Sequence, residues 1–189
     1  MVKKNKLPNN AKRVFKGEIF EVWQWPQKMY DGSVETFEML KRPDTTEVIA
    51  AVGDKIALLT QKQPDRLEAF MSLVGGRREN GERPLNAAKR ELLEETGYVS
   101  RDWKLWQAAN PVGKIVWTVY TYIARDCLFW QPPRPDAGEK ITVKLVSYDE
   151  FLKLADAPDF SGEELAKQLW RARGDKKEYK KFHKLLFGK

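Results

Sequence analysis

Short apolar runs separated by turn residues occupy the first third of the chain, and they predict β-strands. Residues 15–28 are rich in aromatic and β-branched side chains, and Asp31-Gly32 is typical of a hairpin turn. Two further apolar runs flank Gly53-Asp54, the pattern of strands that are buried on both faces. We therefore expect an antiparallel hairpin followed by two central strands. The expected strands are 15–28, 33–41, 47–52 and 56–61.

A helical pattern interrupts the strands between Pro84 and Thr96. Proline suits the first turn of a helix, and Gly97 directly after the pattern suits its end. The segment 131–138 contains three prolines and predicts a break in regular structure. Strands with one central helix and helices at the end make an α+β fold. The remaining expected strands are 104–108, 114–124 and 141–147, and the remaining expected helices are 148–155 and 163–187.

The length and the charge favour one folded domain with basic ends. A chain of 189 residues suits a single domain, which we expect over residues 15–158. We expect a basic tail over residues 1–14 and a basic helical extension over residues 159–189. The net charge of +7 favours polyanionic partners, either nucleic acid or small phosphate compounds. Solvated ends would explain the same charge, so charge alone does not decide the function.

The scarcity of long apolar runs and of cysteine indicates the cellular compartment. No apolar run approaches the length of a membrane span, and no apolar stretch follows the charged start as in a secretory signal. Cys127 is the single cysteine, so an internal disulfide is excluded, which fits a reducing compartment. We expect a cytoplasmic protein without a membrane partner. His183 is the single histidine, and a catalytic pair with Cys127 is a reading that the sequence does not favour.

Three glutamates share one side of the expected helix. At 100° per residue, Glu91, Glu94 and Glu95 fall within an arc of about 100° near the C-terminal end. Like charges this close repel, and the helix dipole makes that end worse for anions. A bound cation would neutralise them, and carboxylate oxygens select magnesium, manganese or calcium over zinc. The alternative is an ordinary acidic, solvated helix face.

Two other features of this helix fit a site beside a sheet. An apolar stripe of Leu85, Ala88 and Leu92 adjoins the acidic arc and would hold the helix against the strands. Arg90 precedes Glu94 by four residues, a spacing at which its guanidinium can hold that carboxylate in place. The carboxylates would then face a cleft.

The stretch 76–98 resembles the Nudix box at every specified position and every spacing. The resemblance implies a Nudix hydrolase with the Nudix fold, an α/β/α sandwich around a mixed central sheet, in which the box forms a loop-helix-loop. It further implies that box glutamates bind divalent cations while water attacks a phosphorus of a diphosphate. The matching residues are Gly76, Glu82, Arg90, Glu91, Leu92, Glu94, Glu95, Gly97 and Tyr98.

Site residues carried over from this family are expectations for the present chain. Glu91 and Glu95 would be the principal metal ligands, Glu94 a third, and the main-chain carbonyl of Gly75 a further one. Arg90 and Glu82 would support these ligands. The cofactor implied is Mg²⁺, with Mn²⁺ as a possible substitute. We count Glu94 and Arg90 among the residues needed for catalysis.

Around the box, the chain is similar to the branch of the family that hydrolyses ADP-ribose and other nucleoside diphosphate sugars. The paired N-terminal strands, Pro111 after the box and an acidic loop before residue 141 occur in that order. In that branch a loop glutamate often acts as the general base, and Glu139 is the best match, with a solvated loop acid as the alternative. The chain departs from the branch at Val74, Gln63 and Lys114, which puts specificity for ADP-ribose in doubt.

Substrate-binding residues can be suggested from residue type. Arg42, Arg66 and Arg77 are candidates for gripping phosphates. Trp23 and Trp25 are two apart and share one face of a strand, so one of them could stack on a nucleobase. The alternative is that they fill the core or a contact between subunits, since the related branch often forms homodimers.

Three functions remain open from the sequence. The leading hypothesis is a metal-dependent enzyme that cleaves a nucleoside diphosphate sugar to a nucleoside monophosphate and a sugar phosphate. The second is a Nudix hydrolase of nucleoside triphosphates, dinucleoside polyphosphates or capped RNA, although we do not expect nucleic acid as the partner. The third is a non-catalytic nucleotide-sugar sensor, which the complete set of box glutamates argues against.

Overall fold

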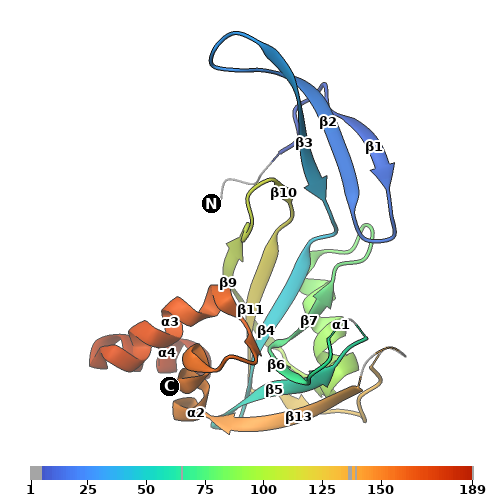
Figure 1. Ribbon diagram of the computed structural model, residues 1–189. Helices are drawn as coiled ribbons and strands as arrows, with labels where there is room; N and C mark the ends of the chain where they lie inside the picture. The colour runs from blue at the N-terminus through green and yellow to red at the C-terminus, as the bar shows by residue number, and fades with distance from the viewer. Residues whose placement is uncertain (1–5, 65, 136–137, 139, 189) are drawn as a thin grey trace.

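The computed structural model describes residues 6–64, 66–135, 138 and 140–188. A four-stranded sheet, an eight-stranded sheet, a separate two-stranded sheet and a set of helices make up this part of the chain. The four-stranded sheet, which we call the smaller sheet, stands away from the eight-stranded, larger sheet (Figure 1). Asp136 and Glu139 of the expected acidic loop lie outside the described residues.

The N-terminal strands form the smaller sheet, in the order β1-β2-β3-β10. The expected hairpin is present, with β2 and β3 antiparallel and Gly32 of the turn at a φ of 90°. Strand β1 precedes β2, the first strand of this hairpin. It begins at Lys12, inside residues 1–14, which we expected to be a tail. The strands are β1 (Lys12–Lys16), β2 (Glu21–Lys28), β3 (Val34–Lys41) and β10 (Ile115–Val116).

The larger sheet is mixed, as expected for this fold. β11 runs parallel to β4 and antiparallel to β9, and β13 runs antiparallel to β5. Its main order is β14-β6-β5-β4-β11-β9, with β7 also paired to β4. A separate two-stranded sheet joins β8 (Tyr98–Val99) and β12 (Leu128–Phe129). The strands are β4 (Thr45–Val52), β5 (Lys55–Lys62), β6 (Phe70–Ser72), β7 (Val74–Arg77), β9 (Asp102–Ala109), β11 (Val119–Arg125), β13 (Lys140–Ser147) and β14 (Phe160–Ser161).

Helices cover both faces of the larger sheet, which confirms the expected α/β/α sandwich. Side chains of β4 alternate between two hydrophobic clusters because a strand points successive residues to opposite faces. Val48 packs with Leu92 of α1, whereas Ile49 packs with Phe151 of α2 and Leu169 of α3. The helices are α1 (Pro84–Thr96), α2 (Tyr148–Lys153), α3 (Glu163–Gly174) and α4 (Lys176–Phe187), with a 3₁₀ turn over Leu154–Asp156.

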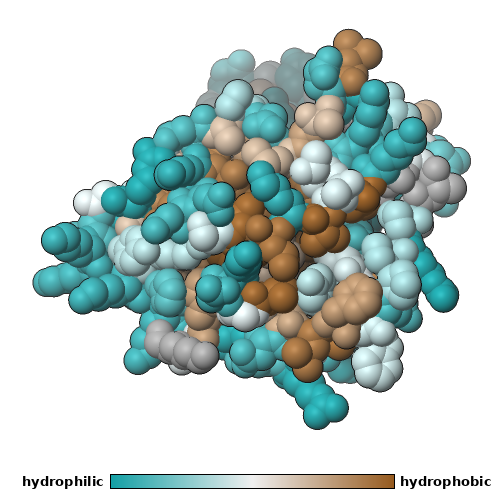
Figure 2. Space-filling view, turned by 90° about the horizontal axis from the view of Figure 1, so that it is seen from below, coloured by the Kyte–Doolittle hydropathy of each residue, from teal (hydrophilic) through white to brown (hydrophobic). Residues whose placement is uncertain are grey.

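The C-terminal segment is part of the core rather than an added extension. Leu165, Leu169, Phe182 and Leu186 are buried in the cluster beneath the sheet. The expected helix over 163–187 is divided in two at Asp175, whose carboxylate accepts from the backbone N–H of Lys177 and Glu178. Seen from below, hydrophilic side chains cover most of the surface, and most of the visible hydrophobic residues gather toward the middle, with a few at the edges (Figure 2). No helix in the described ranges is long and apolar enough to cross a membrane.

Candidate active site

Gly75 and Gly76, the two central residues of β7, allow β4 and the helix α1 to approach this strand closely. A Cβ on Gly75, whose φ is 151°, would lie 2.1 Å from the carbonyl oxygen of Thr46 on β4. A Cβ on Gly76 would lie 2.5 Å from Oε1 of Glu91 on α1. Only glycine leaves room for both contacts. The backbone of β7 and the carboxylate of Glu91 are therefore packed directly against each other.

Helix α1 has the bounds that its local sequence predicts. Pro84 occupies its first turn, and Gly97 ends it in the left-handed conformation at a φ of 72°. Ala88 and Leu92 are buried against the sheet. This packing brings the adjoining acidic side of the helix against the glycines of β7.

Glu95 is a buried carboxylate with a backbone partner. Its side chain belongs to a residue only 4% exposed, and its Oε2 accepts from the N–H of Gly75 at 2.7 Å. Burial of a charge is costly unless it is paired or bound to a cation. The contact joins the last turn of α1 to strand β7.

Arg90 connects three glutamates of the box. Its Nη1 lies 2.9 Å from Oε1 of Glu91 and donates to Oε2 of Glu94 at 3.0 Å. Its Nε donates to Oε1 of Glu82 at 3.2 Å, and its Nη2 donates to the carbonyl oxygen of Arg77 at 3.0 Å. Burial alone would lower the pKa of Arg90, but the bonds to Glu82 and Glu94 and the charge of Glu91 outweigh burial and raise it. One guanidinium thus orients the carboxylates that repel one another.

The same contacts affect the carboxyl of Glu82. Burial would raise the pKa of Glu82, but the hydrogen bonds from Arg90 and from the N–H of Glu79 and the positive charges nearby lower it overall. Glu82 is thus held ionised in the loop before the helix. Its place is that of a support for Arg90.

The acidic residues offer the ligand type of a hard divalent cation. Glu91, Glu94 and Glu95 line one cavity together with Gly75. In the present arrangement Glu91 and Glu94 face Arg90, and within the described residues no three acidic, histidine or cysteine side chains form a ready metal-binding group. The donor set of carboxylates and a backbone carbonyl fits Mg²⁺ or Mn²⁺ in chemistry.

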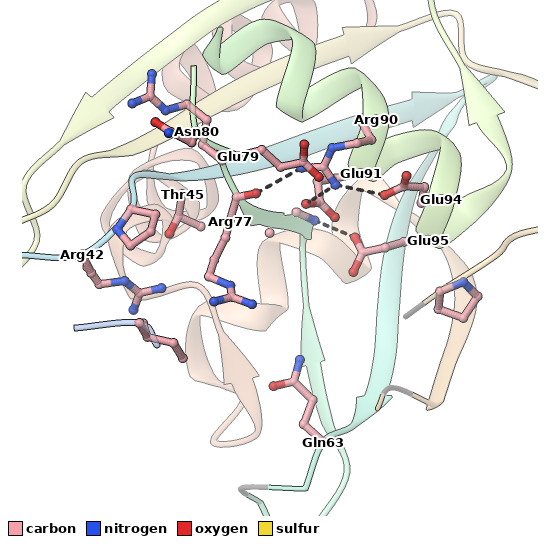
Figure 3. A pocket seen from close by; sticks show the side chains of 16 residues that line it. Arg42, Thr45, Gln63, Arg77, Glu79, Asn80, Arg90, Glu91, Glu94 and Glu95 are labelled. Atoms are coloured by element: carbon pink, nitrogen blue, oxygen red, sulfur yellow. Dashed lines mark hydrogen bonds and ion pairs between the residues drawn. The ribbon is translucent and has the colours of Figure 1, made fainter. Parts of the chain in front are cut away.

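Arginines form the opposite wall of this cavity of about 820 Å³. Figure 3 shows Arg42 and Arg77 on one side and Glu91, Glu94 and Glu95 on the other. Arg42 is half-buried, and its Nε has no hydrogen-bond partner among the described residues. Burial lowers the pKa of Arg42, and the charge of Arg77 lowers it further. An anion between these two guanidinium groups would relieve their repulsion.

Some expected substrate-binding residues lie elsewhere. The guanidinium of Arg66 stacks on Phe70 at 3.9 Å, and Arg66 does not line the cavity. Trp25 packs against Phe37 with ring centroids 5.2 Å apart, and Trp23 donates to Oε2 of Glu21 at 2.8 Å. Neither tryptophan lines the cavity of this chain. The contact of Trp25 with Phe37 is of the kind that the packing alternative describes.

Trp117 is an aromatic residue at the site that the sequence did not indicate. Its ring centroid lies 4.6 Å from Cζ of Arg42, and its Nε1 donates to Oγ1 of Thr45 at 2.9 Å. Thr45 lines the cavity beside Arg42. No local pattern around Trp117 distinguishes it from the other six tryptophans, because its partners come from a distant part of the chain.

A catalytic pair of Cys127 and His183 is excluded by their positions. Cys127 is buried in the cluster beside α1, and burial with the charge of Asp126 raises the pKa of its thiol to about 12. His183 packs against Tyr148 and Phe187 on the opposite face of the sheet. The cysteine is a structural residue.

Comparison with known proteins identifies the family. A model of the NUDIX domain matches residues 41–168 of this chain of 189. The chain belongs to the Nudix family. It is a Nudix hydrolase, as the box residues indicated. The matched region begins just before β4 and ends within α3, so the C-terminal helices are partly included in it.

Individual relatives extend the likeness beyond the domain. The chain is 25% identical to an ADP-ribose pyrophosphatase of Bacillus subtilis over 148 residues, which cover 77% of this chain and 80% of that protein. It is 26% identical to a methanol dehydrogenase activator of Bacillus methanolicus over 118 residues, covering 61% of this chain and 63% of that protein. Among solved structures, an ADP compounds hydrolase matches with a TM-score of 0.73 at 19% identity, covering 88% of this chain and 91% of that one. The last comparison shows the shared fold.

Proposed function

We propose that this Nudix hydrolase cleaves the diphosphate of a nucleoside diphosphate sugar, ADP-ribose first, in a reaction that requires a divalent cation. The observation that carries the proposal is the two-sided cavity. Box carboxylates line one wall, and Arg42 and Arg77 line the other. A diphosphate is the anion that both walls can share, through a cation on the acidic side and guanidinium groups on the basic side.

On the acidic wall, Glu91 and Glu95 would be the main ligands of Mg²⁺ or Mn²⁺, with Glu94 and the carbonyl of Gly75 as further ligands. The bound cation would supply neutralisation of phosphate charge and a lower pKa for the attacking water. Arg90 holds Glu91 and Glu94 on the same side of α1 before any cation arrives. This preorganisation reduces the cost of gathering several carboxylates at one site.

On the basic wall, Arg42 and Arg77 would bind the phosphate oxygens. Both line the cavity, and Arg42 is already partly desolvated, so its bond to an anion would be stronger than one made in water. Gln63, one of the positions where the sequence departs from the ADP-ribose branch, lines the same cavity. The neutral amide leaves space and polarity for an uncharged part of the substrate, which agrees with a sugar more than with a third phosphate.

We further propose Glu139 as the general base. Its described neighbours support this role, because Pro135 lines the cavity and Lys140 pairs with Lys62, the residue next to Gln63 of the cavity wall. Exchange of Glu139 for glutamine should slow the chemical step while leaving cation affinity unchanged. An unchanged rate would assign the base to a glutamate of the box.

The choice of ADP-ribose rests on two supports besides the cavity. The names of two similar proteins, an ADP-ribose pyrophosphatase and an ADP compounds hydrolase, indicate substrates with an ADP group.

A homodimer is a further proposal, because Val14, Phe15 and Val34 of the smaller sheet are each more than half exposed in one chain. Light scattering after gel filtration would give the mass of the particle in solution and decide this point.

The function is tested by a substrate panel read by product identity. ADP-ribose, UDP-glucose, GDP-mannose, a deoxynucleoside triphosphate and a diadenosine polyphosphate are compared by kcat/KM with Mg²⁺, and again in excess chelator. The expected products from ADP-ribose are AMP and ribose phosphate, and the chelator should abolish turnover. Full turnover in chelator would refute the metal-dependent reaction. A tenfold advantage for the triphosphate or the dinucleoside would refute the choice of substrate class.

A further inference from the structure

Two connections run side by side between the smaller and the larger sheet. One leads from β3 to β4 through Arg42, and the other leads from β10 to β11 through Trp117. The two chain segments pair in parallel before these connections, at Val116 with Lys41. They pair in parallel again after them, at Val119 with Thr45. The N–H of Arg42 donates to the carbonyl of Val116 at 3.3 Å. The backbone therefore places Arg42 and Trp117 opposite each other at the junction of the sheets.

The guanidinium of Arg42 lies near two aromatic rings at this junction. The ring centroid of Trp117 is 4.6 Å from its Cζ, and that of Phe20 is 5.6 Å away. Tryptophan is the aromatic side chain that attracts cations most strongly. Contacts with rings leave the hydrogen-bonding edge of a guanidinium available, and Nε of Arg42 has no partner among the described residues.

The hydrogen bond between Trp117 and Thr45 has only one possible direction. An indole N–H can donate but not accept, so Oγ1 of Thr45 is the acceptor at 2.9 Å. The hydroxyl therefore keeps its own proton for an acceptor on the cavity side, where Thr45 is part of the wall. Trp117 itself does not line that cavity.

We propose that Trp117 is a positioning residue that holds two donors, the Arg42 guanidinium and the Thr45 hydroxyl, as one phosphate-binding unit of the cavity. This inference rests on the proposed function. The ring face of Trp117 sets the plane of the guanidinium, and its N–H turns the hydroxyl of Thr45 toward the ligand. Trp117 acts through these two residues and has no contact with the substrate.

The proposal predicts a separation of effects among substitutions. Trp117→Leu removes both the ring and the N–H, and we expect a rise in KM for ADP-ribose of about 2- to 30-fold with kcat within about twofold. Trp117→Phe keeps a ring beneath Arg42 but loses the N–H, and it should give a smaller rise. Thr45→Val, which removes only the hydroxyl, should raise KM as well. Thr45→Ser keeps the hydroxyl and should leave KM near the wild-type value.

A mutant cycle distinguishes a positioning role of Trp117 from a purely structural one. Binding of inorganic pyrophosphate is measured by titration calorimetry with Mg²⁺ present, so the readout does not depend on turnover. Trp117→Leu should weaken binding in the wild-type background and have no further effect, within about twofold, when Arg42→Ala and Thr45→Val are already present. Trp103→Leu is the matched control. Trp103 is also half-buried with a bonded indole N–H, but it packs on Tyr122 away from the cavity.

The outcomes distinguish this inference from the proposed function. If Trp117→Leu leaves pyrophosphate affinity unchanged, or weakens it equally in both backgrounds, Trp117 does not position these donors. If the coupling is found but no diphosphate sugar is hydrolysed, the positioning role stands and the proposed substrate class is wrong. If the wild-type protein binds no pyrophosphate, both are overturned. Melting temperatures of Trp117→Leu and Trp103→Leu, which should fall by similar amounts, show whether either variant has lost its fold.

Discussion

Gly76 and Glu91 are packed so closely that adding one methyl group to the glycine would test the acidic wall. In Gly76→Ala the new Cβ would lie 2.5 Å from Oε1, 2.7 Å from Cδ and 2.8 Å from Oε2 of Glu91. Ordinary contact begins at 3.4 Å, so the carboxylate must move by about 0.9 Å, the difference between 3.4 and 2.5 Å. The obstructing atoms are the end of a flexible side chain, so the backbone can stay in place.

The size of the effect follows from this displacement. Moving the carboxylate breaks its 2.9 Å contact with Arg90, which costs about 1–2 kcal/mol and lowers the melting temperature by roughly 2–8 °C. A ligand misplaced by about 1 Å can reduce turnover by about 10²-fold. We therefore expect a folded protein with kcat reduced by about two orders of magnitude and a weaker affinity for Mn²⁺.

The assay separates the metal site from the fold. Turnover of ADP-ribose is measured across a range of Mg²⁺ concentrations, Mn²⁺ affinity by titration, and unfolding by circular dichroism. Gly113→Ala is the control, because a Cβ at Gly113 meets no atom within 4 Å. If Gly76→Ala matches the wild type in both turnover and Mn²⁺ affinity, Glu91 does not hold the cation from this position.

Three other substitutions or reagents give direct expectations. Glu95→Gln should reduce turnover by about 10²–10⁴-fold with the fold intact, because it removes a buried charge with little change in shape. The control Glu35→Gln, at an exposed position on β3, should leave turnover unchanged in the same assay. Arg66→Ala should leave kcat/KM within about twofold, since Arg66 is not part of the cavity wall, and a tenfold loss would place it in the site. Iodoacetamide at pH 8 should not label Cys127 in the folded protein, because a pKa of about 12 leaves only about 1 thiol in 10⁴ as the thiolate. Unfolding in urea should permit labelling, and mass spectrometry measures the labelled fraction in both states.

Local signals explain which helix ends were predictable. Helix α1 begins at Pro84 and ends before Gly97 as expected, because both residues act on the backbone directly beside them. The division between α3 and α4 was missed, although the signal is present. Asp175 is a good helix-capping residue and Glu178 follows three positions later.

The first strand shows the limit of a reading based on composition. Residues 1–14 are basic, which favours a solvated tail, yet Lys12 and Arg13 pair with Gln24 and Trp23 of β2. A strand at the edge of a sheet needs a partner more than it needs apolar side chains, and all five residues of β1 are exposed. The partner lies beyond a turn, so the pattern of β1 alone does not indicate it.

The two walls of the cavity differ in how much the sequence reveals because they are built in different ways. The acidic wall comes from one helix and the loop before it, so residue spacing alone places Glu91, Glu94 and Glu95 on one side. The basic wall is made where two sheets meet, and Trp117 reaches Arg42 and Thr45 only because parallel strands align two distant connections. Spacing carries no information about such a contact. In the proposed function this second wall binds the phosphates, so the box residues predict the chemistry, whereas the positioning of the phosphate follows only from the fold.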